Sequence, residues 1–339
     1  MNHTPLRIGM ALAVVLAVAA AAGAAPASPK AGVYQYVIHQ AQGTPAEVAA
    51  AIAGAAPGAG FEVLAAVPVG SPEGCGYTAS VVALYQPDYA KKVLTANRKT
   101  GPFAIVDRVN VFEDENGVHV SVVNPRSILR TVLMEDEAHS DLIEEHLADL
   151  RELILGAVEG EASEQEYGKV RKKGHIGRTM GVMAGGPFNK KVQDVSVVGG
   201  EDWRAMAQRV EEALRVEGPK WGTSLAYTLE LPDFELTVFG TTGTPMDTKS
   251  FGIVGAGADK SRKKLSCPGL AHAGAYPNEV VVTSEGTTIS TRIVDSMYRM
   301  KMYFEDAGKW AFMKNMGMPG SIASETEAQI QAAADTYAP

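Results

Sequence analysis

Apolar runs of strand length alternate with helix-forming segments in the first half of the chain. Thr44 is a typical helix N-cap residue, Pro45 suits a first helical turn, and Asn116-Gly117 is a strong hairpin signal. Strands are expected at 33–38, 61–69, 77–85, 103–112 and 118–123. Helices are expected at 45–53, from Pro87 onward, and at 136–157. This order predicts an α+β fold, an antiparallel sheet with helices on one face.

The second half of the chain repeats this order of elements. Asp202 is placed to cap a helix whose apolar residues share one face, and a short helix is expected at 259–265. Strands are expected at 195–198, 223–229, 234–239, 279–283 and 288–294. The recurrence predicts an internal duplication, with one repeat in each half of the chain.

Two ordered stretches of the first half, FEVLAAVPVG and YQPDYAKKVLTANRKTGPFAIVDRVNVFEDENGVHVSVVNPRSIL, resemble the DUF302 (TT1751-like) family. The second half resembles it more distantly, because its glycine-rich residues 255–257 and the insertion CPGLAHAGAYP depart from the pattern. The resemblance implies two copies of a β-α-β(4)-α unit, a TBP-like sheet packed by helices, which is commonly found in dimers and has no established activity. A homo-oligomer is therefore among the expected assemblies.

The N-terminal residues have the pattern of an export signal. Arg7 precedes an apolar run at 8–22, and small residues at 22–24 and 25–27 suit a signal peptidase. The run is shorter than the roughly 20 apolar residues of a membrane span. We therefore expect a periplasmic or secreted protein without a membrane span. Its expected parts are a signal peptide (1–27), a first domain (31–158), a charged linker (159–190), a second domain (191–322) and a C-terminal helix or tail (323–339).

Net charge and cysteine content further limit the classes of function that the chain could have. The chain has 31 Lys and Arg against 39 Asp and Glu, a net charge of −8, which argues against a nucleic-acid partner. Cys75 and Cys267 are its two cysteines. In an oxidising compartment they either form one disulfide or remain free, and a free Cys267 at a helix end would be reactive.

Soft metal ligands gather between Cys267 and residue 320, where six of the 13 methionines lie between Met297 and Met318. Thiolate, imidazole and thioether suit copper or an axial position on haem. Tyr276 stands where the axial methionine of a cupredoxin loop would stand, and between His175 and His272 there is no further histidine. The candidates for a ligand or metal site are Cys267, His272, Tyr276, Met297, Met300, Met302, Met316, Met318 and His175. Plain core packing competes with this interpretation, because methionine fills irregular cores.

The leading hypothesis is an exported binding or accessory protein that holds a soft metal, haem or small ligand in its second domain. A redox or hydrolytic enzyme using Cys267 or the pair Glu305-Asp306 is an alternative, although a Gly-x-Ser-x-Gly motif is absent from the sequence. A structural module for protein interaction is a second alternative. The expected partner is a small ligand or another exported protein. His119, His139 and His146 are expected at the surface.

Overall fold

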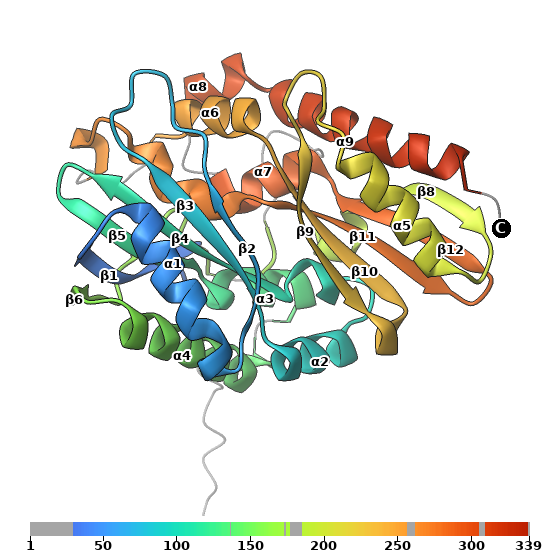
Figure 1. Ribbon diagram of the computed structural model, residues 1–339, viewed down its shortest axis with the longest axis horizontal. Coiled ribbons are helices and arrows are strands. Elements are labelled where there is room, and N and C mark those ends of the chain that lie inside the picture. The colour runs from blue at the N-terminus through green and yellow to red at the C-terminus, as the bar shows by residue number, and fades with distance from the viewer. Residues whose placement is uncertain are drawn as a thin grey trace, which may run out of the picture.

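The computed structural model describes residues 30–135, 137–172, 174–176, 185–255, 262–304 and 309–337. Two antiparallel sheets lie next to each other, one in the blue and green part of the chain and one in the yellow and red part (Figure 1). Their edge strands β2 (Glu62–Pro68) and β9 (Ser224–Leu231) are in contact. The expected signal peptide lies outside the described residues, and none of the helices in the described part is long and apolar enough to cross a bilayer.

The remaining elements follow the same order in each half. Those of the first repeat are β1 (Tyr34–Ala41), α1 (Pro45–Ala55), β3 (Ala79–Tyr85), α2 (Pro87–Ala96), β4 (Val106–Asp114), β5 (Gly117–Val123), α3 (Pro125–Leu133), α4 (Ser140–Ala157), β6 (Glu161–Ala162) and β7 (Glu166–Tyr167). Those of the second repeat are β8 (Val192–Gly199), α5 (Trp203–Leu214), β10 (Leu236–Thr242), α6 (Thr244–Ile253), β11 (Asn278–Glu285), β12 (Thr288–Val294), α7 (Ser296–Phe304), α8 (Lys309–Lys314) and α9 (Met318–Asp335). Short 3₁₀ turns η1 (Ala56–Ala59), η2 (Gly101–Phe103), η3 (Phe188–Lys190), η4 (Pro232–Phe234), η5 (Arg262–Lys264) and η6 (Pro268–Ala275) connect them.

Sheet topology confirms the predicted fold class. The first sheet has the strand order β2-β3-β4-β5-β1-β6, with β7 also paired to β1. The second has the order β9-β10-β11-β12-β8 when read from the same side. Along the chain, α5 and α6 fall between strands β8 to β12 as α1 and α2 fall between β1 to β5, so the two sheets are copies of one topology. The protein is an α+β fold made of two repeats.

Each repeat has its own helix-covered core. The capping box of Thr44 and Glu47 starts α1, and the Asp202 side chain accepts from the Ala205 N–H to start α5. Val48 and Ile52 of α1, with Leu150 and Ile154 of α4, are buried on the first sheet. The second sheet is covered in the same way by α5 and α9. Their apolar side chains recur at helical spacing, as the sequence predicts.

The opposite faces of the sheets meet in one large core that contains residues of both repeats. The turn η6, which lies within the insertion CPGLAHAGAYP, packs against β3, β4 and β5 of the first sheet. The backbone of Gly274 lies close to the first sheet, because a Cβ atom added at this residue would be only 3.1 Å from Cγ2 of Val123. The insertion that departs from the family pattern therefore packs the two repeats together.

Two of the expected connecting segments contact the repeats. In the described part of the expected linker 159–190, β6 and β7 pair with β1, and Tyr167 is 3% exposed. The C-terminal helix or tail expected at 323–339 falls largely on α9, which begins at Met318 and packs on α5 and β8. In the first repeat α4 covers its sheet in the same way.

Two helices also differ from the prediction. The counterpart of α2 in the second repeat is α6, since each follows the second strand of its sheet, and not the expected helix at 259–265. Within that segment the structure has only the short turn η5, while residues 256–261 lie outside the described part. The single long helix expected at 136–157 is preceded by α3, which the Asn124 side chain caps by accepting from the Arg126 N–H.

Candidate functional site

A cavity of about 110 Å³ lies in the second repeat between the sheet and helices α6, α7 and α9. Its wall is mainly apolar. The strands contribute Val280, Ile293 and Val294, and α9 contributes Met318 and Ile322 at a spacing of four residues. The other lining residues are Ser250, Ile253, Val254, Tyr276, Asn278, Glu279, Ser296, Arg299, Met300, Phe304, Asn315, Pro319, Ala323 and Thr326.

One end of the cavity carries buried charge. Arg299 of α7 is 8% exposed, and its Nη2 donates to the backbone oxygens of Ala275 (2.5 Å) and Pro277 (3.0 Å). The same Nη2 lies 3.5 Å from Oε2 of Glu279, a residue that is 6% exposed. The rings of Tyr276 and Tyr303 flank the guanidinium. A charged group is stable at such burial only where hydrogen bonds and opposite charges compensate for the loss of its hydration.

Glu279 joins the two repeats through Arg108 of β4. Nη1 of Arg108 donates to Oε1 of Glu279, and its Nη2 donates to the Tyr303 hydroxyl at 2.6 Å. Burial alone would lower the pKa of Arg108, but the Glu279 carboxylate and Tyr303 outweigh it and raise that pKa. The three charged groups therefore form one network across the interface between the repeats.

Arg108 and Glu279 stand at equivalent positions of the duplication. The hairpin turns are closed by Asp114 opposite Gly117 in the first repeat and by Glu285 opposite Thr288 in the second. Counted back along each strand from its hairpin turn, Arg108 occupies the same position on β4 as Glu279 does on β11. The ion pair thus links the same position of both repeats.

The first repeat has a buried aromatic pair next to the position that corresponds to Asn278. Its equivalent of Asn278 is Asp107, whose Oδ1 lies 2.8 Å from His146 Nε2. The His146 ring stacks on Tyr89, with centroids 3.4 Å apart. Arg299 has the apolar counterpart Ile128 on α3. The polar residues at these positions, Arg299 above all, therefore distinguish the second repeat from the first.

Three of the candidates taken from the sequence line the cavity, namely Tyr276, Met300 and Met318. Burial raises the pKa of Tyr276 to about 12, so this phenol is neutral, and its hydroxyl lies 2.8 Å from Ser250 Oγ. Met302 belongs to the shared core, Met297 is half-buried, and Met316 and His175 are exposed. Glu305 and Asp306 lie outside the described residues.

His272 and Cys267 do not line the cavity, and both have structural contacts. His272 is fully buried against Tyr34, Tyr167 and Phe304, and its Nδ1 lies 3.3 Å from Nη2 of Arg262. Among the described residues, His, Cys, Asp and Glu side chains form no group of three or more that could hold a metal ion.

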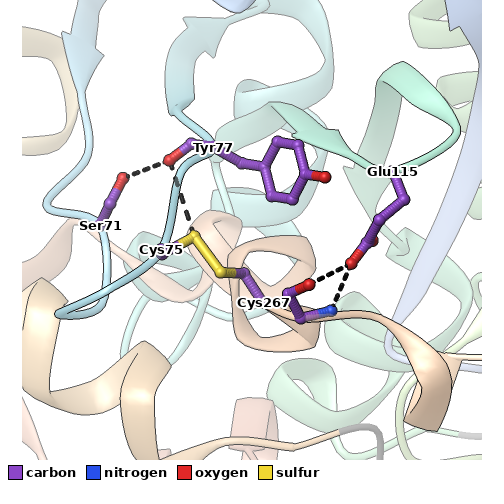
Figure 2. The surroundings of a disulfide bond; sticks show 6 residues. Ser71, Cys75, Tyr77, Glu115 and Cys267 are labelled. Carbon is purple, nitrogen blue, oxygen red and sulfur yellow. Dashed lines mark hydrogen bonds between the residues drawn. A yellow bond between two sulfur atoms is a disulfide. The ribbon is translucent and has the colours of Figure 1, made fainter.

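Cys75 and Cys267 form a disulfide, with Cα atoms 6.0 Å apart. It connects the loop between β2 and β3 to the insertion before η6, as Figure 2 shows. Glu115 supports the same junction by accepting from the Ser266 N–H at 2.6 Å. A bridged sulfur is neither a thiolate ligand nor a nucleophile, so the alternatives that need a free Cys267 do not apply to the bridged protein.

Two histidines expected at the surface are buried in the first repeat. His146 is held between Asp107 and Gln86, and its Nδ1 lies 3.0 Å from Gln86 Oε1. His119 is 4% exposed, and its Nδ1 lies 3.1 Å from Nδ1 of His39. Burial and the neighbouring His119 lower the pKa of His39. Sequence periodicity missed these positions because the partners of both buried rings lie on other elements.

A depression of about 660 Å³ on the first repeat is larger but is lined largely by charged side chains. Arg126 pairs there with Glu144, and Arg151 lies 3.3 Å from Glu164. These charges neutralise one another at the solvent boundary, where such pairs contribute little. The cavity of the second repeat is the better candidate, because it combines apolar walls with few polar groups.

The fold and the cavity define a two-repeat α+β protein with an internal site in its second repeat. No family model and no curated protein matches the chain. Among solved structures, the chain is similar to an uncharacterized conserved DUF302 protein from Bacillus stearothermophilus, with 16% identity and a TM-score of 0.31. The match covers 37% of this chain and 98% of that chain. A likeness at this level carries no argument about function, which has to rest on the site.

Proposed function

We propose that this chain is an exported binding protein whose second repeat holds a small, mainly apolar molecule. The observation that carries this function is the cavity itself, which combines mainly apolar walls with a few polar groups. An apolar cavity of about 150 Å³ takes one benzene molecule, so about 110 Å³ suits four or five carbon-sized atoms. Haem does not fit, because pockets for drug-sized ligands measure roughly 300 to 1,000 Å³.

The donor set of the cavity favours an organic ligand over a soft metal. Met300 and Met318 supply thioethers, but the lining residues include neither histidine nor cysteine. Export is supported by the N-terminal apolar run after Arg7 and by the disulfide, since such bridges persist in oxidising compartments. The predicted location is therefore the periplasm or the exterior of the cell.

Methionine-methyl NMR tests the binding function. Isobutanol, a neutral probe with four carbons, is titrated into the mature protein labelled at the methionine methyl groups. The methyl signals of Met300 and Met318 are expected to shift. The signal of Met206, a core residue of α5 that does not line the cavity, is expected to stay unchanged. Shifts spread over all methionines, or absent from Met300 and Met318, would contradict the proposal.

A cavity-filling variant sharpens this test. Ala323→Leu adds three carbons to the cavity wall on α9 and is expected to abolish the isobutanol shifts. Ala148→Leu is the matched control, because Ala148 is exposed on α4, the equivalent helix of the first repeat. If both variants bind the probe like the parent protein, the cavity is not the site.

A further inference from the structure

The polar end of the cavity has more positive than negative charge. Among the described residues, the network consists of two guanidinium groups, Arg108 and Arg299, and the single carboxylate of Glu279. All three side chains are less than 10% exposed. A buried charge without an ionic partner is costly, so this end of the cavity favours an additional anion.

Arg108 and Arg299 both retain unused donors, and Arg299 is the one of the two that lines the cavity. Oε1 of Glu279 accepts from Arg108, and the contact of Glu279 with Arg299 is longer, at 3.5 Å. Both hydrogen bonds that Arg299 donates to described residues come from Nη2. Its Nη1 donates to none of them, and its Nε is buried without a partner. The guanidinium therefore retains donor capacity next to the apolar wall.

A nearby carboxyl group is occupied elsewhere. Asp247 of α6 accepts from the Gly70 N–H at 3.2 Å and from the Thr242 hydroxyl at 3.0 Å. Its side chain does not belong to the cavity lining, although Ser250, one turn further along the same helix, does. Asp247 therefore connects α6 to the loop after β2, and Arg299 shares the single carboxylate of Glu279 with Arg108.

We propose that the ligand is a small aliphatic monocarboxylate, bound with its carboxylate at Arg299 and its hydrocarbon part between Val280, Met300 and Ile322. This inference rests on the proposed binding function and specifies the class of ligand. The hydrocarbon part matches the apolar lining, and the carboxylate supplies the missing negative charge. A hydrogen bond between a guanidinium and a carboxylate is stronger than one between neutral groups.

Isobutyrate and isobutyramide separate the two proposals, because they share a carbon skeleton and differ in charge. Both are titrated at pH 7 into the mature protein, and the methyl signals of Met300 and Met318 report binding. Isobutyrate is expected to bind at least about tenfold more tightly, as one charge-assisted hydrogen bond predicts. Equal affinities would overturn the carboxylate inference and leave the binding function intact. If neither probe binds, the binding function itself fails.

Asn278→Asp tests the role of charge without touching Arg299. The new carboxylate at the polar end takes the place of the anion of the ligand, so the variant should lose the preference for isobutyrate and still bind isobutyramide. The fold accommodates this change, since Asp107 occupies the equivalent position in the first repeat. Asn116→Asp adds the same charge at an exposed hairpin turn and is expected to keep the preference. A variant Asn278→Asp that still prefers isobutyrate would refute the inference.

Discussion

Neutralising Glu279 is expected to destabilise the protein more than removing Arg108. In Glu279→Gln, both Arg108 and Arg299 stay buried with only neutral oxygen atoms around them, from the new amide, a hydroxyl group and the backbone. Breaking a buried ion pair from one side costs about 3 to 5 kcal/mol. In Arg108→Met, Glu279 still has Arg299 at 3.5 Å, so the cost is that of a few unsatisfied groups, about 1 to 3 kcal/mol.

Thermal unfolding followed by circular dichroism measures this difference. At roughly 2 °C per kcal/mol for a chain of this size, Glu279→Gln should melt about 4 °C below Arg108→Met. Glu285→Gln is the matched control at the end of the same strand. The Glu285 side chain is exposed to solvent, so its ion pair with Arg292 contributes less than about 1 kcal/mol. If Glu279→Gln is no less stable than this control, the network does not hold the repeats together.

Two further predictions concern the junction between the repeats. Burial raises the pKa of Asp247 to about 7, well above the usual value of an aspartate, so the folded state loses stability as the pH rises from about 4 to 7. The stability of Asp247→Asn relative to the parent should therefore be greater near pH 8 than near pH 4 in urea unfolding, and a pH-independent difference would contradict this. Replacing Cys75 and Cys267 together by serine should cost about 2 to 4 kcal/mol under non-reducing conditions. A reductant should then destabilise only the parent, and equal effects on both proteins would refute the role of the disulfide.

The fold could be predicted from sequence wherever local signals were strong. The caps at Thr44 and Asp202, the turn at Asn116-Gly117 and the repeated order of strands all lie close to the bounds that the structure shows. The helix α6 was missed because its apolar residues share no single face. Its N-cap residue, Gly243, also has no side chain that could cap the helix. The helix α3 was missed because it is short and lies directly before α4.

The candidate site could be predicted only in part. The methionine-rich pattern led to Met300 and Met318, but it also selected Met316, which is exposed. Arg108 and Glu279 were missed because each finds its partner in the other repeat, and no local pattern records such a contact. A usable signal did exist, since both are charged residues within apolar strand runs, where an unpaired charge would be costly.

Duplication within one chain explains how the site in the second repeat can differ from the equivalent region of the first repeat. In a symmetric dimer of single repeats, the residue at the position of Arg108 would face another copy of itself, and like charges would repel. Fusing two repeats in one chain frees the two positions to differ, and here they carry Arg108 and Glu279 as a pair. The same freedom allows Ile128 in one repeat and Arg299 in the other. One repeat can therefore fill its interior with Tyr89 and His146 while the other keeps a cavity with a cationic end.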